Sequence, residues 1–359
     1  MHNRCVNIDW LEVFCNETSN LLNADYFVAK GYKVVMRNYG TPQYREMFTI
    51  WDDGQPFIEV RRDPYSLREV GGIFRRGDCH LRLVNKACYS LSPIDDLRKF
   101  LIAHGYTYNA LSRIDICLDF NFFDNGQRPD RVLEDYMCGK ISKINQCNIA
   151  AHGKDSFGGR TWHSLSWGSP SSTIRTKLYC KSLEMREVHE KPYILDQWLA
   201  AGLDLDRDVW RVEFSIKSDL KHLVKLDTGE LIKHDLSCYD DRHKCLFAFL
   251  SFASIYFHFK TLVYTKNGTP QRKDRCPDKI LFRTSADEKA YKPIRCTTKH
   301  DLTRTDRILI NKLYDIYHDY NNSVCVRQSA HTLIVELTQG LHAHKFRNIA
   351  NDLILGYDD

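Results

Sequence analysis

The segment Ser112-Arg-Ile-Asp-Ile-Cys-Leu-Asp-Phe120 alternates polar and apolar residues along its whole length. Successive side chains of a β-strand point to opposite faces, so this period of two predicts a strand with one apolar face. Arg113, Asp115 and Asp119 then share the other face. Two ionised carboxylates on one face are costly without a cation beside them, and hard cations such as Mg²⁺ favour such oxygen ligands. The other reading is structural, with Asp115 paired to Arg113 or to a neighbouring lysine.

A second strand is predicted from Ile174 to Cys180, with Arg175, Lys177 and Tyr179 on one face and Lys181 just beyond it. A tyrosine among several cations is a candidate nucleophile, because cations stabilise a phenolate and neutralise a phosphate under attack. The alternative is an amphipathic strand with a half-buried tyrosine.

A third strand is predicted from Val209 to Lys217 and places Arg211, Glu213 and Ser215 on a common face. Glu213 is therefore a third candidate carboxylate for a metal ion. Its structural alternative is an ion pair with Arg211 or Lys181.

The rest of the chain divides into a strand-rich part and a helical part. Further strands are predicted at 8–14, 32–37, 47–51 and 57–61, and helices at 93–104 and 192–201. Helical periodicity dominates 240–264, 302–320 and 328–353. We therefore predict an α+β domain at 1–220 and a mainly helical C-terminal extension at 221–359.

Composition excludes several classes of protein. The chain has 359 residues, of which 43% are hydrophobic and 27% charged, which is typical of a globular protein. The longest apolar run, 245–259, is shorter than the roughly 20 residues of a membrane span, so we expect no membrane association. Thirteen cysteines without a Cys-x-x-Cys pair, together with the absence of a signal-peptide pattern at the start, favour a reducing, cytoplasmic location.

Positive charge is concentrated in one region. Residues 260–307 contain 13 Lys and Arg against six Asp and Glu, a net charge of +7, whereas the whole chain carries only +5. Such a region is suited to contacts with a nucleic-acid backbone, although a solvated lysine-rich loop would have the same composition.

The three strands together resemble the replication initiation factor family, the Rep_trans-type rolling-circle initiators and related relaxases. Arg113–Phe120 is similar to the family's R-x-D-x-x-x-D-F strand. Trp167–Glu184 is similar to its G-S-x-x-S segment followed by an R-x-Y-x-K strand, and Trp210–Ile216 to its R-x-E strand. The early segment Ile8–Leu11 also agrees with the family's pattern. Cys180 is a departure, because many relatives have Asp or Asn at that position.

The resemblance implies an antiparallel sheet of the HUH/RRM-like kind with helices packed on one face. It implies that Tyr179 attacks a DNA phosphodiester, forming a 5′-phosphotyrosyl bond and leaving a 3′-OH for a polymerase. Asp115, Asp119 and Glu213 would then hold Mg²⁺ or Mn²⁺.

In the same family-based reading, Lys181 and Arg211 would stabilise the transition state. The partners would be a single-stranded or hairpin DNA origin and the host helicase and polymerase, on a plasmid or another mobile element.

Two alternatives remain open from the sequence. One is a relaxase that processes a transfer origin by the same chemistry. The other is a non-catalytic single-stranded DNA-binding protein that uses aromatic side chains of the sheet as stacking platforms.

Overall fold

The fold is described from a computed structural model. The described residues are 3–17, 22–37, 40–65, 67, 74–145, 147–156, 159–188, 190–225, 229–283 and 291–294. The predicted helices at 302–320 and 328–353, and the basic residues beyond 294, lie outside them.

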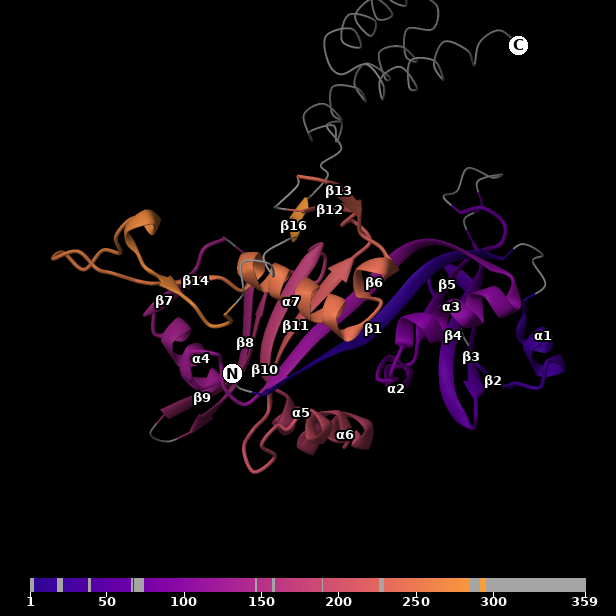
Figure 1. Ribbon diagram of the computed structural model, residues 1–359, viewed down its shortest axis with the longest axis horizontal. Helices are drawn as coiled ribbons and strands as arrows, with labels where there is room; N and C mark the ends of the chain where they lie inside the picture. The colour runs from indigo at the N-terminus through magenta and orange to yellow at the C-terminus, as the bar shows by residue number, and fades with distance from the viewer. Residues whose placement is uncertain are drawn as a thin grey trace, which may run out of the picture. The chain divides into compact units, whose positions relative to one another are not determined.

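A ten-stranded, fully antiparallel sheet forms the centre of the described structure (Figure 1). Its strands lie in the spatial order β2 (Lys33–Met36), β3 (Tyr44–Asp52), β4 (Gln55–Pro64), β5 (Asp78–Leu83), β1 (Arg4–Glu17), β6 (Tyr106–Phe120), β11 (Trp210–Lys217), β10 (Ile174–Cys180), β9 (Gly159–Trp167) and β8 (Ile149–Ser156). The three strands that hold the candidate site residues, β6, β11 and β10, are therefore direct neighbours.

Two small antiparallel sheets, seven α-helices and two 3₁₀ helices, η2 (Leu236–Tyr239) and η3 (Lys273–Arg275), complete the described elements. One small sheet contains β13 (Leu231–Lys233), β12 (His222–Lys225) and β16 (Tyr291–Ile294), and the other β15 (Asp278–Lys279), β14 (Phe259–Thr261) and β7 (Ile141–Lys143). The helices are α1 (Ala24–Ala29), α2 (Asn85–Cys88), α3 (Pro93–His104), α4 (Pro129–Met137), α5 (Lys181–Glu187), α6 (Pro192–Ala200) and α7 (Arg242–Tyr256).

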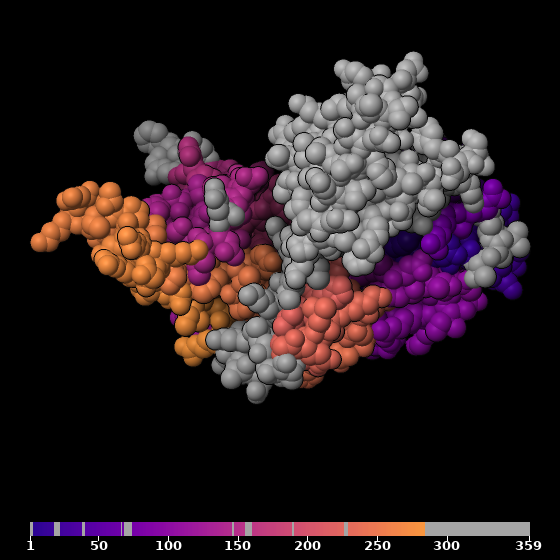
Figure 2. Space-filling view, turned by 90° about the horizontal axis from the view of Figure 1, so that it is seen from above, coloured from indigo at the N-terminus to yellow at the C-terminus, as the bar shows by residue number. Residues whose placement is uncertain are grey.

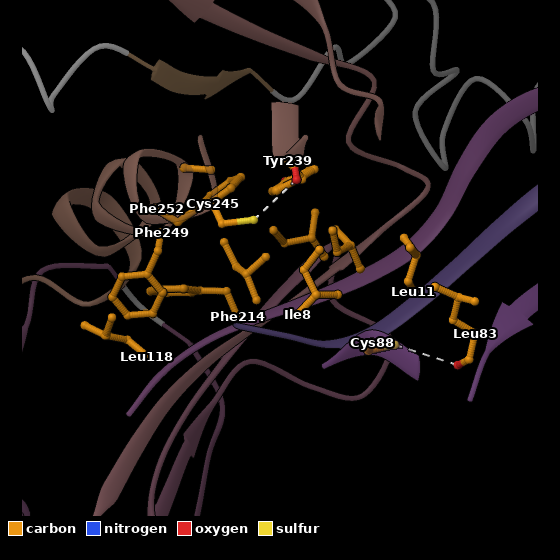
Figure 3. Close-up of a cluster of buried hydrophobic side chains, with 14 of the residues drawn as sticks. Ile8, Leu11, Leu83, Cys88, Leu118, Phe214, Tyr239, Cys245, Phe249 and Phe252 are labelled. Atoms are coloured by element: carbon orange, nitrogen blue, oxygen red, sulfur yellow. Dashed lines mark hydrogen bonds between the residues drawn. The ribbon is translucent and has the colours of Figure 1, made fainter. Parts of the chain in front are cut away.

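The apolar face of the large sheet packs against helices to form the main core. Phe214 of β11 lies 5.1 Å, between ring centroids, from Phe249 of α7, and Figure 3 shows this contact beside Ile8 and Leu118. Helices α1, α3 and α4 cover the same face further along the sheet, whereas α5 and α6 lie at one end of the opposite, polar face. The described cysteines are free thiols, and most of them are buried.

Local sequence signals explain two of the boundaries. Helix α3 begins with Pro93 in its first turn and ends at Gly105, whose φ of 72° is a left-handed conformation that glycine adopts easily. The β3–β4 hairpin turns at Asp53 and Gly54, with φ of 46° and 70°, as two-residue hairpin loops with positive φ at both positions require.

The predicted α+β class with an antiparallel sheet is confirmed. The predicted strand 112–120 is the second half of a longer strand, β6, and the predicted helix 240–264 ends at Tyr256 as α7. One compact unit extends from Met1 to Ile294, so α7 belongs to the unit that contains the sheet. The assignment of catalysis to 1–220 stays a prediction. Within the described residues, none of the helices combines the length and apolar character needed to cross a bilayer.

Replacing Phe249 with alanine should destabilise the protein by about 3–5 kcal/mol, because this fully buried ring packs between Phe214 and Phe282. Urea denaturation measures the change. Ile102→Ala on α3 is the control, since that side chain is 80% exposed and its removal should change the free energy of unfolding by less than about 0.5 kcal/mol. Equal effects of the two substitutions would contradict this packing.

Candidate functional site

The polar face of the sheet arranges the candidate residues in three cross-strand rows. The first row holds Asp115, Ser215 and Arg175, the second Cys117, Glu213 and Lys177, and the third Asp119, Arg211 and Tyr179. The sequence-based assignment of these residues to one face is therefore correct. Their partners, however, follow from the register, which brings diagonal as well as direct neighbours together.

Tyr179, Glu213 and Lys177 form one hydrogen-bonded cluster. The Tyr179 hydroxyl donates to Glu213 Oε2 at 3.0 Å, and Lys177 Nζ donates to Glu213 Oε1 at 2.7 Å. The Glu213 side chain is only 4% exposed, whereas that of Lys177 is 30% exposed. The predicted ion pair of Glu213 with Arg211 or Lys181 is thus replaced by a pair with Lys177.

The electrostatics of Tyr179 differ from the prediction. We expected neighbouring cations to stabilise its phenolate. Instead, burial and the charge of Glu213 raise the pKa of Tyr179 well above its ordinary value, although Arg211 acts in the opposite direction. The side chain is therefore a neutral phenol at physiological pH, and its hydrogen bond to Glu213 provides a route for the proton.

Lys181 lies next to Tyr179, where β10 passes directly into α5. Its side chain is 2% exposed, pairs with Glu184 and places its ammonium 5.6 Å from the centroid of the Tyr179 ring. In this position the charge of Lys181 acts on Tyr179 across the ring face.

Arg211 is held inside a buried network. Its guanidinium donates to both oxygens of Asp119 at 2.6 and 2.7 Å, to Asp9 at 2.8 Å and to the Tyr89 hydroxyl at 3.0 Å. Trp198 of α6 adds a hydrogen bond of 2.7 Å to Asp119. Arg211 and Asp119 are both fully buried, so the predicted contact of Arg211 with a transition state does not fit this geometry.

Asp115 pairs with Arg113 on its own strand, as the structural alternative proposed. Both carboxylate oxygens accept from the Arg113 guanidinium, at 2.9 and 2.6 Å. Burial raises the pKa of Asp115 to about 6, an effect that these hydrogen bonds oppose and the charge of Glu213 increases.

The three predicted metal ligands do not fit a shared ion in this arrangement. Four residues along a strand span about 13 Å, so Asp115 and Asp119 are too far apart for one Mg²⁺ with ligand distances near 2.1 Å. In addition, each carboxylate oxygen of Asp115, Asp119 and Glu213 already accepts a hydrogen bond. No cluster of three His, Cys, Asp or Glu side chains suited to a metal ion is found in the described parts of the chain.

A cavity of about 480 Å³ opens beside Tyr179. It lies between β8, β9, β10 and α5, and its lining includes His152, His163 and Lys177. The Nε2 atom of His163 is buried and has no hydrogen-bond partner among the residues that the structure describes. Tyr179 itself also lines this cavity.

Sequence analysis missed the role of Asp9, Tyr89 and Trp198 around Arg211. Asp9 lies at a β-bulge between Ile8 and Trp10, and this bulge turns its side chain toward the polar face. Alternation counted back from the buried Leu11 would place Asp9 on the apolar face, so the pattern of the strand did not single it out, and only the motif similarity of Ile8–Leu11 pointed to this segment.

Comparisons with known proteins give a likeness in structure. No family model matches the chain, and no curated protein matches it in sequence. Among solved structures, the chain is similar to a rolling circle replication initiator protein from Geobacillus stearothermophilus, with a TM-score of 0.44 and 15% sequence identity. The match covers 77% of this chain and 92% of the other. At this identity the initiator's activity does not transfer to this chain.

Replacing Arg211 with methionine should destabilise the protein by about 3–5 kcal/mol, because Asp119 would remain buried without its cation. The double variant Arg211→Met/Asp119→Asn should recover part of this loss. Urea denaturation provides the measurement. Arg186→Met, which breaks an exposed pair with Asp208, is the control and should cost at most about 1 kcal/mol. A stable Arg211→Met variant would show that the network is dispensable.

The raised pKa of Asp115 should make stability depend on pH. Because its pKa is about 6 in the folded protein, against an ordinary value of 3.8, stability linked to its protonation is present below about pH 4 and is lost as the pH rises to 6. Between these pH values, the free energy of unfolding of the wild type should fall by up to about 3 kcal/mol relative to that of Asp115→Asn. Urea titrations at several pH values test this, and a constant difference would contradict it.

Proposed function

We propose that this protein is a DNA nicking and joining enzyme that initiates rolling-circle replication, with Tyr179 as its nucleophile. The observation that supports this most directly is that Tyr179 lines a cavity while its hydroxyl donates to Glu213. Attack on a phosphodiester by a phenol requires a group that accepts the phenol proton and is helped by a nearby positive charge, and Tyr179 has both beside it.

In the proposed step, the Tyr179 oxygen attacks the scissile phosphorus while its proton moves to Glu213 Oε2. The bond between phosphorus and the 3′ oxygen breaks, and that oxygen leaves with the electron pair and takes a proton from water. The products are a 5′-phosphotyrosyl bond and a free 3′-OH. Because the number of phosphodiester bonds is unchanged, a 3′-OH can later reverse the step and rejoin the strand.

Lys177 has two roles in this proposal. Its hydrogen bond holds Glu213 in place as the proton acceptor, and its 30% exposed side chain places positive charge beside an incoming phosphate. Lys181 adds a second positive charge behind the Tyr179 ring. Scissile DNA must be single-stranded, or extruded from a hairpin, to reach the cavity.

The predicted requirement for Mg²⁺ or Mn²⁺ stays a prediction, and no step above depends on a metal ion. Incubation of wild-type protein with labelled origin DNA in EDTA, Mg²⁺ or Mn²⁺ tests it. Nicking only with added metal would support the requirement, and nicking in EDTA would exclude it.

Replacing Tyr179 with phenylalanine should abolish the covalent protein–DNA adduct and reduce nicking at least about a thousandfold, because the attacking oxygen is removed. The assay uses a labelled single-stranded origin oligonucleotide, followed by peptide mapping of the adduct. Tyr65→Phe is the matched control, since that tyrosine is 51% exposed and lies far along the chain from the site, and it should leave the adduct unchanged.

The same assay separates this proposal from its alternatives. An adduct that persists in Tyr179→Phe would identify another nucleophile. Salt-sensitive binding by the wild type without any nicking would favour the single-stranded DNA-binding alternative. Nicking of a transfer origin but not of a replication origin would favour the relaxase.

A further inference from the structure

A projecting hairpin follows β14 and contains four of the eight described Lys and Arg residues of the basic region, 260–307. Figures 1 and 2 show this orange segment extending away from the large sheet, beyond β7. Its two halves are joined by backbone hydrogen bonds from the Gln271 amide to the Val263 carbonyl at 2.7 Å and from the Thr265 amide to the Thr269 carbonyl at 2.8 Å. The turn between the two halves, at residues 266–268, includes Gly268 with a φ of 74°.

The base of the hairpin is fixed to the turn after α4. The Leu262 amide donates to the Lys140 carbonyl at 2.8 Å, and the Tyr264 hydroxyl donates to the Gly139 carbonyl at 2.6 Å. Cys276 is buried where the segment returns to β15. These contacts hold the hairpin as a defined arm and give it a fixed direction.

Three positively charged side chains of the hairpin are not paired with acidic side chains of the described structure. Lys266, Arg272 and Arg275 are exposed, and none of the three has an ion-pair partner among the described residues. Lys273 donates to the Ile144 carbonyl, and Asp274 is the only acid between 262 and 276. The cations of the arm are therefore available to an external anion.

We propose that this arm, residues 262–276, binds duplex DNA next to the cleavage site by entering a groove. A two-stranded β-ribbon fits the major groove, which is about 12 Å wide, and Lys and Arg beside it contact phosphates. Thr265, Asn267, Thr269 and Gln271 on the same ribbon offer polar groups to base edges. This proposal rests on the proposed function for the identity of the nucleic acid and adds a surface separate from Tyr179.

The test compares Lys266→Ala/Arg272→Ala/Arg275→Ala with a charge-matched control, Lys30→Ala/Lys86→Ala/Lys99→Ala, whose exposed lysines lie on other elements. Binding to an origin hairpin with a flanking duplex is measured across a series of salt concentrations. Loss of three phosphate contacts should reduce the slope of log affinity against log salt by about 3, and affinity at low salt by about tenfold or more. The control should retain the wild-type slope to within about 1.

Nicking of a short single-stranded oligonucleotide at saturating concentration is the second measurement, and the arm variant should match the wild type there. The proposal is overturned if the arm variant and the control change the salt slope equally, or if the duplex flank adds nothing to wild-type affinity. A third outcome is possible, in which the wild type forms no adduct but still binds duplex DNA through the arm. This outcome would refute the proposed nicking function and leave the proposed DNA-binding arm standing.

Discussion

The buried ion pair of Arg211 and Asp119 is the interaction on which the rest of the polar face depends. An uncompensated charge at full burial would be very costly, and here the guanidinium and the carboxylate satisfy each other with two hydrogen bonds. Asp9, Tyr89 and Trp198 meet the remaining donors and acceptors. The pair therefore ties β1, β6, β11 and α6 together, and it fixes the register that places Tyr179 beside Arg211.

The three candidate carboxylates, Asp115, Asp119 and Glu213, are each paired with a different cation, and this division determines which of them can take part in chemistry. Both oxygens of Asp119 accept hydrogen bonds from Arg211, and both oxygens of Asp115 accept hydrogen bonds from Arg113. Glu213 alone of the three shares its charge between an ammonium and a phenol. The arrangement thus assigns structural roles to two of the acids and leaves the third in contact with the candidate nucleophile.

Alternation along three strands was sufficient to predict the fold class and the common face of Tyr179 and Glu213, because side-chain direction in a strand is a local property. Contacts between strands are not local. The partners of Glu213 and Asp119 depend on register, and the contribution of Asp9 depends on a bulge that no periodicity reveals. The three-carboxylate metal site was predicted from the shared face alone, whereas a shared ion also requires short distances along the strand, and Asp115 and Asp119 are about 13 Å apart along β6.

In the proposed reaction, an incoming phosphate brings negative charge toward Glu213. Lys177 is hydrogen-bonded to the other oxygen of Glu213 and is 30% exposed, so it can balance part of this charge. Burial and the charge of Glu213 raise the pKa of Tyr179, so its phenol is neutral before any substrate binds. In the proposed reaction the attacking oxygen therefore forms only as the proton leaves.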